Sequence, residues 1–312
     1  MTHLILTPGD PKGIGPEITV KALQRLGEFP DDLSLTIIGS MEALEKVAAQ
    51  LNLKLPQSPR VKYRAVEAAK PGTVAYQAID QAVQMIAAKE ADALVTGPIS
   101  KKNLHAADYQ AHGHTEILET LTTKYFPTLL TAHKAEMLFV HKNFRLLLLT
   151  RHIALSEVPA ALAKPGAVAG PLKTLIAYLR HTLKVDEPRI AMLALNPHAG
   201  EIGGGEEKKF FMPVIYAVNG VGASKLEGPF PADAFFRGFD AQDSGYDAVV
   251  AAYHDQGLIP FKLLAGYEAV NVTIGLPFLR TSVGHGTAED IAGKGIASEA
   301  SLIAALHVAM KQ

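Results

Sequence analysis

The sequence lacks cysteine, an excess of charge of either sign and any long apolar run. Without cysteine there are no disulfides, thiolate nucleophiles, iron–sulfur clusters or cysteine-type zinc sites, so any transition metal must be bound by histidine and carboxylate side chains. Its 30 Lys and Arg residues nearly balance its 31 Asp and Glu residues. Nonspecific attraction to nucleic-acid phosphates needs a basic surface, so we expect no nucleic-acid partner.

The missing apolar runs also bear on location. No run approaches the roughly 20 residues that span a bilayer, so we expect no membrane partner. The first residues lack the basic and long apolar regions of a secretory signal, and we therefore expect a cytoplasmic protein. The chain has 312 residues, of which 48% are hydrophobic. A chain of this length usually folds around more than one hydrophobic core, so we expect two lobes that share a cleft.

Short apolar runs of strand length alternate with longer segments of helical composition. The expected strands are 4–7, 35–38, 93–96, 146–150, 190–195, 248–253 and 269–274. The expected helices are 17–26, 41–51, 73–89, 166–184, 208–219 and 299–311. Such alternation is typical of βαβ units, so we predict an α/β fold around a mostly parallel sheet.

Polar or glycine-rich residues follow nearly every expected strand. In open α/β sheets, ligands bind beyond the carboxyl ends of the strands. His152, His198 and His254 each stand just beyond such a strand, 46 and 56 residues apart. Three neutral imidazoles with an open position can bind a divalent metal that polarises a substrate oxygen. Alternatively, each is a hydrogen-bonded loop residue, and the residues alone leave both interpretations open.

A second group supplies hydrogen-bond donors and fixed cations. It consists of His114, Thr115, Lys262, Asn271 and Arg280. These side chains can hold a phosphate or a carboxylate, although a solvated surface role is the alternative for the two cations.

Two glycine-rich segments are less specific. The loop at 203–205 is either an anion site built from backbone amides or a flexible surface loop. The segment Gly9–Glu17 joins the first strand to a helix but matches neither the Walker pattern nor GxGxxG, so we interpret it as a tight turn in a cleft.

Six motifs in order, from about residue 4 to the C-terminus, resemble the 4-hydroxythreonine-4-phosphate dehydrogenase family of vitamin B6 biosynthesis. They are Gly9-Asp10-Pro11-Lys12-Gly13-Ile14-Gly15-Pro16-Glu17, Thr96-Gly97-Pro98-Ile99-Ser100-Lys101, Gly113-His114-Thr115-Glu116, Asn196-Pro197-His198-Ala199-Gly200-Glu201, Tyr253-His254-Asp255-Gln256-Gly257 and Gly275-Leu276-Pro277-Phe278-Leu279-Arg280-Thr281-Ser282. In addition, segment 285–295 is similar to the adenosine-binding loop of the isocitrate and isopropylmalate dehydrogenases.

These resemblances imply a two-lobed α/β/α fold of the isocitrate and isopropylmalate dehydrogenase type, with the active site in the interdomain cleft. The implied cofactor-side lobe is 1–118 plus 262–312, and the implied second lobe, with the dimer contacts, is 119–261. NAD is the implied cofactor. Its implied contacts are Gly286, Thr287 and Asp290.

The family resemblance also implies a site shared across a homodimer. Its metal ligands fall on His152, His198 and His254, with zinc expected first and cobalt or magnesium as alternatives. Its substrate contacts fall on His114, Thr115, Lys262, Asn271 and Arg280. The implied reaction oxidises and decarboxylates 4-phosphohydroxy-L-threonine to 3-amino-2-oxopropyl phosphate. From adjacency to His254, we add Asp255 as a proton relay or as a residue that orients a ligand.

Three positions depart from the expected family pattern: Lys12 and Arg151 each replace a small residue, and Gly284 stands where Asp is common. The substrate is therefore open. One alternative is a related dehydrogenase acting on D-threonate or D-erythronate 4-phosphate. A second acts on an aromatic dihydrodiol carboxylate, and a third is a non-catalytic protein that binds a metabolite or metal.

Overall fold

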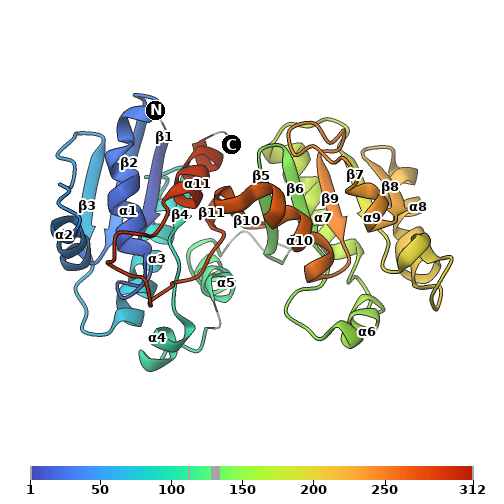
Figure 1. Cartoon of the computed structure of the whole chain (residues 1–312), viewed down its shortest axis with the longest axis horizontal. Coiled ribbons are helices and arrows are strands. Elements are labelled where there is room, and N and C mark those ends of the chain that lie inside the picture. Colours follow the sequence, from blue (N-terminus) through green and yellow to red (C-terminus); the bar gives the residue numbers. More distant parts are fainter. Residues whose placement is uncertain (1, 112, 128–133, 311–312) are drawn as a thin grey trace. The chain divides into compact units, whose positions relative to one another are not determined.

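The computed structural model describes residues 2–111, 113–127 and 134–310, and the chain divides into two compact units (Figure 1). The first comprises Met1–Thr131 and Val270–Gln312, and the second comprises Ala132–Ala269. The sequence-based divisions at 118/119 and 261/262 fall inside the helices α5 (His114–Tyr125) and α10 (His254–Ala265). Each helix packs as a whole within one unit, so the observed divisions come later in the chain, beyond the helix ends.

The first unit is built on strands in the order β3-β2-β1-β4-β11-β10. Their bounds are β1 (Thr2–Thr7), β2 (Leu33–Gly39), β3 (Val61–Ala65), β4 (Ala93–Thr96), β10 (Val270–Ile274) and β11 (Leu279–Val283). Neighbours are parallel except for β10, which runs antiparallel to β11. The carboxyl ends of β1, β2 and β4 therefore meet at one edge of the sheet, where the loops after them converge.

Helices cover both faces of this sheet. On one face α1 (Gly15–Gln24) contacts α2 (Met41–Gln50) and α11 (Ala300–Met310), and on the other α3 (Pro71–Ala87) contacts α4 (Lys101–Ala106) and α5 (Figure 1). A short turn, η1 (Leu26–Glu28), follows α1. Ser40 begins α2 as its N-cap, because its side chain accepts a hydrogen bond from the Ala43 amide.

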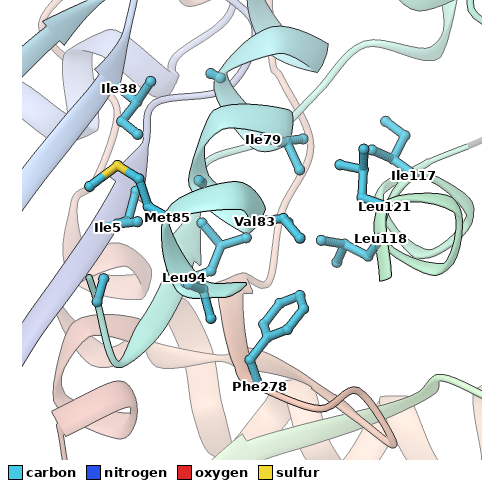
Figure 2. Packing of buried hydrophobic residues seen from close by; sticks show 14 of the residues in the cluster. Ile5, Ile38, Ile79, Val83, Met85, Leu94, Ile117, Leu118, Leu121 and Phe278 are labelled. Carbon is cyan, nitrogen blue, oxygen red and sulfur yellow. The ribbon is translucent and has the colours of Figure 1, made fainter. Parts of the chain in front are cut away.

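The hydrophobic core of the first unit lies between the sheet and the α3 and α5 helices. Figure 2 shows Ile5 and Leu94 of the sheet, Val83 of α3 and Leu118 of α5 converging on one another, all fully buried, with Phe278 beside them. The apolar side chains of α3 recur at helical spacing and so form one face that packs on the strands. This packing fixes α5, whose first residue is His114.

The second unit has strands in the order β5-β6-β9-β7-β8. The strands are β5 (Glu136–His141), β6 (Phe144–Leu148), β7 (Arg189–Leu193), β8 (Lys225–Phe230) and β9 (Ala248–Ala251). The pair β5–β6 is antiparallel and the other pairs are parallel. The helices and helical turns are η2 (Leu155–Glu157), α6 (Val158–Leu162), α7 (Ala169–Ala177), η3 (Tyr178–Thr182), η4 (Pro197–Gly200), η5 (Glu207–Phe211), α8 (Met212–Val221), α9 (Ala232–Phe235), α10 and η6 (Gly266–Glu268).

The core of the second unit packs α10 against the β5, β6 and β9 strands. Phe144 and Phe261 lie 5.4 Å apart between ring centroids, and both are buried. Gly257 of α10 approaches Leu146, Leu148 and Ala251 so closely that a β-carbon there would collide with their side chains. This close approach holds the start of α10, where His254 lies, against the carboxyl ends of two strands.

The predicted α/β fold is confirmed, and each of the seven expected strands is present within a few residues. Four further strands were not predicted from the sequence: β3, β5, β8 and β11. Each contains charged residues, and β8 also contains Gly and Pro, so none is a plain apolar run. The last expected helix, 299–311, corresponds to α11, and its residue 311 lies outside the described residues. Among the described residues, no helix is long and apolar enough to span a membrane.

Candidate functional site

A buried arginine defines the candidate site in the first unit. Arg280 in β11 is only 2% exposed, and its guanidinium donates hydrogen bonds to Thr96 Oγ1 at 2.6 and 3.1 Å and to Thr273 Oγ1 at 2.9 Å. Burial lowers the pKa of Arg280 to about 9, so the group still carries its proton at neutral pH. No carboxylate among the described residues pairs with it. A buried cation without a counter-ion calls for an anionic ligand.

Two unsatisfied polar atoms accompany Arg280. His114 Nε2 and Asn271 Oδ1 are buried and have no hydrogen-bond partner among the described residues. Asn271 lies on the same sheet face as Arg280, because the register pairs Asn271 with Ser282 and Thr273 with Arg280. Thr115, the next residue of α5, is partly exposed beside His114. The first unit therefore brings together four of the five predicted substrate contacts.

His114 is neutral at this site. Burial lowers its pKa well below the ordinary value, and the positive charge of Arg280 lowers it further. A hydrogen bond with the Gly97 backbone raises the pKa, but by less. A neutral imidazole next to a guanidinium donates or accepts one hydrogen bond without adding a second charge. The pair is thus suited to a tetrahedral oxyanion such as a phosphate.

Lys262, the fifth predicted substrate contact, belongs to the second unit. It is exposed in the last turn of α10, and no ion pair of its side chain occurs in the described part of the chain. It is a free cation near the C-terminus of its helix. Its assignment to the substrate remains a prediction.

His152 and His254 lie together in the second unit. Their ring centroids are 5.8 Å apart, and both rings line a cavity of about 300 Å³. His152 follows β6, and His254 is the first residue of α10. His254 Nδ1 lies 2.7 Å from Asp255 Oδ1, a hydrogen bond that leaves Nε2 as the ring nitrogen available to a ligand.

His198, the third predicted ligand, lines a different cavity. This cavity of about 640 Å³ shares Tyr253 and Asp255 with the first and is also lined by Asp233 and Gln256. His198 and Ala199 both have left-handed backbone angles, with φ of 54° and 53°. Within the described ranges, no three His, Cys, Asp or Glu residues are grouped closely enough to hold a metal ion. The structure thus pairs His152 with His254 and leaves His198 apart.

Gln256 fixes the loops that carry these histidines, a role not predicted from the sequence. Its Oε1 accepts a hydrogen bond from the Ala252 amide, and its Nε2 donates to the Ala194 carbonyl, so one side chain ties the ends of β9 and β7. The Thr150 hydroxyl donates to the Ala252 carbonyl at 2.7 Å and adds the end of β6. A polar residue directly after a buried strand, as in the motif at 253–257, was the available signal.

The glycine loop at 203–205 binds a carboxylate of the chain itself. A hydrogen bond from its own backbone amide, and after it one from the Gly204 backbone, lower the pKa of Glu206, whose carboxylate also accepts from Asn196 Nδ2 at 3.0 Å. Buried Glu207 accepts from the Asn196 amide at 2.7 Å. Of the two sequence interpretations, the anion site is occupied internally by Glu206, and the loop serves to hold Asn196 and the turn after it.

A third cavity, of about 560 Å³, lies in the first unit at the predicted cofactor loop. Its walls come from Pro11–Gly13, from one side of α2, from the segment that leads into α3, and from Glu289, Ala292 and Gly293. The Ile14 amide donates to the Thr287 carbonyl at 2.8 Å, which joins the first turn to the loop. Gly286 and Asp290 are exposed. Of the predicted contacts Gly286, Thr287 and Asp290, none lines this cavity, whereas Glu289, next to Asp290, does.

The comparisons with known proteins agree with the sequence motifs. Residues 14–309 match the family described as pyridoxal phosphate biosynthetic protein PdxA. The 4-hydroxythreonine-4-phosphate dehydrogenase of Synechocystis is 38% identical, over 99% of this chain and 95% of that protein. A putative D-threonate 4-phosphate dehydrogenase of Bradyrhizobium diazoefficiens is 40% identical, over 98% and 95%.

Solved structures show the same similarity. The crystal structure of 4-hydroxythreonine-4-phosphate dehydrogenase from Klebsiella pneumoniae has a TM-score of 0.83 at 32% identity, over 99% of this chain and 97% of that one. A terephthalate 1,2-cis-dihydrodiol dehydrogenase from Burkholderia xenovorans has a TM-score of 0.64 at 28% identity, over 99% and 98%. A β-decarboxylating dehydrogenase from Thermococcus kodakarensis, at 14% identity and a TM-score of 0.50, shares the fold.

Proposed function

Since the chain belongs to the PdxA family, whose relatives are dehydrogenases, we propose that it oxidises 4-phosphohydroxy-L-threonine with NAD. Hydride leaves carbon 3 for NAD and the hydroxyl proton is released. The 2-amino-3-oxo acid phosphate then loses CO2 and takes up a proton, giving 3-amino-2-oxopropyl phosphate for pyridoxal 5'-phosphate biosynthesis. The observation that carries the proposal is the buried Arg280, which no carboxylate of the described residues pairs with.

The phosphate would be bound by the first unit. Arg280 supplies the charge, His114 and Thr115 supply hydrogen bonds from the start of α5, and Asn271 Oδ1 accepts a bond from a substrate hydroxyl or ammonium group. The positive end of the α5 dipole adds to the attraction. Lys262 is proposed as a further cation for the substrate. This set binds the substrate away from its reacting carbon and so fixes its orientation.

The reacting hydroxyl would lie at the imidazoles of the second unit. His152 and His254 are suited to a divalent metal because imidazole nitrogens bind such ions and the two rings line one cavity with their centroids 5.8 Å apart. We propose zinc, with cobalt or magnesium as alternatives, and His198 from a second copy of the chain as the third ligand. When bound, the metal supplies positive charge that stabilises the oxygen from which the proton leaves and, later, the ketone oxygen.

Asp255 has a positioning role in this proposal. Its carboxylate accepts the Nδ1 hydrogen of His254 and thereby fixes the ring so that Nε2 faces a ligand.

The shared homodimeric site and the cytoplasmic location are further proposals. Light scattering of the purified protein tests the dimer directly.

For NAD we propose the cavity of about 560 Å³ in the first unit. The loop at 285–295, similar to an adenosine-binding loop, forms one wall, with Gly286, Thr287 and Asp290 as its proposed contacts. Lys12 and Lys46 line the same cavity, and neither side chain forms an ion pair within the described ranges. They provide positive charge suited to the pyrophosphate.

A second candidate substrate is D-threonate 4-phosphate. A relative from Salmonella typhimurium, 36% identical, has this name, as does the putative enzyme from Bradyrhizobium. It has the same phosphate and carboxylate, with a hydroxyl in place of the amino group at carbon 2. Arg151 beside His152 specifically favours it, because a guanidinium only donates hydrogen bonds and a hydroxyl oxygen accepts them.

The test is NADH formation by metal-loaded protein with each acid. The His198→Asn variant tests the third ligand, because Asn tolerates the left-handed backbone at this position, and His181→Asn, an exposed histidine of the same unit, is the matched control. Oxidation of either acid that is lost in His198→Asn and kept in His181→Asn supports the proposal. Oxidation of an aromatic dihydrodiol instead, or of none of the three, contradicts it.

A further inference from the structure

Arg151 forms an asymmetric ion pair at the edge of the imidazole cavity. Its Nη2 donates to Glu136 Oε2 at 3.1 Å, and the Arg151 side chain is 31% exposed against 10% for Glu136. The carboxylate is thus the buried member of the pair, and the guanidinium is the member that reaches the surface. Arg151 lines the cavity of about 300 Å³ together with His152 and His254.

Within the described ranges, Arg151 uses one of its donors, in the contact with Glu136. A guanidinium carries five N–H groups, and the contact with Glu136 is the hydrogen bond that Arg151 makes within the described part of the chain. The neighbouring backbone is held in place, because the Thr150 hydroxyl and amide both donate to the Ala252 carbonyl. The cation is therefore held by Glu136 on one side, is partly exposed, and lines the cavity, where further N–H groups can serve a ligand.

We propose that Arg151, held by Glu136, determines substrate preference by favouring a hydroxyl over an ammonium group on the carbon next to the reacting one. A guanidinium only donates hydrogen bonds, and so does an ammonium group, whereas a hydroxyl oxygen accepts. The guanidinium and a substrate ammonium group would also repel each other because both are cations. The partial exposure of Arg151 to solvent weakens this repulsion without reversing it.

This inference rests on the proposed function, which places the reacting carbon 3 at His152 and His254. Carbon 2 is bonded directly to carbon 3, so its substituent lies within reach of the residues that line the same cavity, Arg151 among them. 4-Phosphohydroxy-L-threonine and D-threonate 4-phosphate have the same configuration and differ in this one group, amino or hydroxyl. They are therefore a matched pair of probes.

The experiment measures kcat/KM for both acids and takes the ratio of threonate phosphate to amino-acid phosphate. Arg151→Ser removes the donors and is expected to lower this ratio by about tenfold, the size of one hydrogen bond with a charged group. Arg151→Lys keeps a donor-only cation and is expected to retain most of the preference. Arg180→Ser, an exposed arginine on η3 in the same unit, is the control and should leave the ratio unchanged.

Calorimetric binding of both acids to the metal-loaded protein gives a readout that needs no turnover. The inference is overturned if the ratio in Arg151→Ser stays within twofold of the wild-type ratio, both by kinetics and by binding. If both acids lose affinity equally, the ratio is also unchanged, and Arg151 then binds only the shared carboxylate. If the wild-type protein binds neither acid, the proposed function fails as well. Glu136→Gln loosens the guanidinium and is expected to lower the ratio by a smaller factor; an unchanged ratio there overturns the role of Glu136.

Discussion

Glu17 and Lys21 lie one turn apart in α1, are joined by an ion pair of 3.0 Å, and together bind the backbone of a segment about 280 residues away. Glu17 accepts hydrogen bonds from the amides of Gly295 and Ala297, and Lys21 Nζ donates to the carbonyls of the same two residues. The end of the predicted adenosine-binding loop is thereby fixed to the helix that follows the first turn.

Removing one member of this pair should destabilise the first unit. Glu17 is fully buried, so Glu17→Ala removes the carboxylate that pairs with Lys21 and that accepts hydrogen bonds from two backbone amides. We expect the free energy of unfolding to fall by about 3 kcal/mol. Urea denaturation measures this change. The exposed pair of Arg25 and Glu28 provides the control, because Glu28→Ala should change the stability little. Equal effects of the two substitutions would contradict the anchoring role.

Replacing Arg280 should separate stability from ligand binding. In Arg280→Met, a buried cation that pairs with no carboxylate in the described part of the chain is replaced by an apolar chain of similar length, so we expect the ligand-free protein to unfold at the same temperature or higher. Inorganic phosphate should raise the unfolding temperature of the wild type and not that of the variant. Arg25→Met, at an exposed position, should respond to phosphate as the wild type does. A clear loss of stability in ligand-free Arg280→Met would show that the guanidinium is structural.

His114 should make stability depend on pH. Its pKa lies well below 6.5 in the folded protein because of burial and the charge of Arg280, whereas in the unfolded chain it is ordinary. The unfolded state therefore binds the additional proton first, and the stability provided by neutral His114 is complete above pH 6.5 and is lost as the pH falls below it. The free energy of unfolding, measured by urea between about pH 5 and pH 8, should rise with pH less steeply in His114→Asn. An equal slope in the two proteins would contradict the assignment.

The sequence predicts the parts of the fold that obey simple periodicity. The strand β4 is a short apolar run, and the apolar residues of the helix α3 recur at helical spacing, so the sequence predicts both elements. β11 was missed because Arg280, Thr281 and Ser282 are polar in the interior of a sheet, where the local pattern contradicts the buried location. That conflict occurs at the candidate site, where such conflicts are expected.

The site residues were found from strand ends and motifs, but which of the three histidines line the same cavity was not predicted. The pairing of His152 with His254 depends on how β6 and β9 lie next to each other, and the binding of Glu206 by the glycine loop depends on the fold of a turn. Gln256 was overlooked because the polar motif at 253–257 marks the position but does not show that its side chain holds two backbone groups 4 and 62 residues away. Long-range hydrogen bonds of this kind become visible only in three dimensions.

Asp255 should control metal affinity through His254. Asp255→Asn keeps the size of the side chain but removes the charge that stabilises the Nδ1 hydrogen of the ring, so we expect the affinity for zinc to fall by about tenfold to a hundredfold. Competition with a chelating dye measures this affinity without substrate or NAD. Asp233→Asn is the matched control, because Asp233 lines the neighbouring cavity and, among the described residues, forms no hydrogen bond or ion pair with His254. If Asp255→Asn binds zinc as tightly as the wild type, the carboxylate does not orient the ring, and its hydrogen bond with His254 is a surface contact.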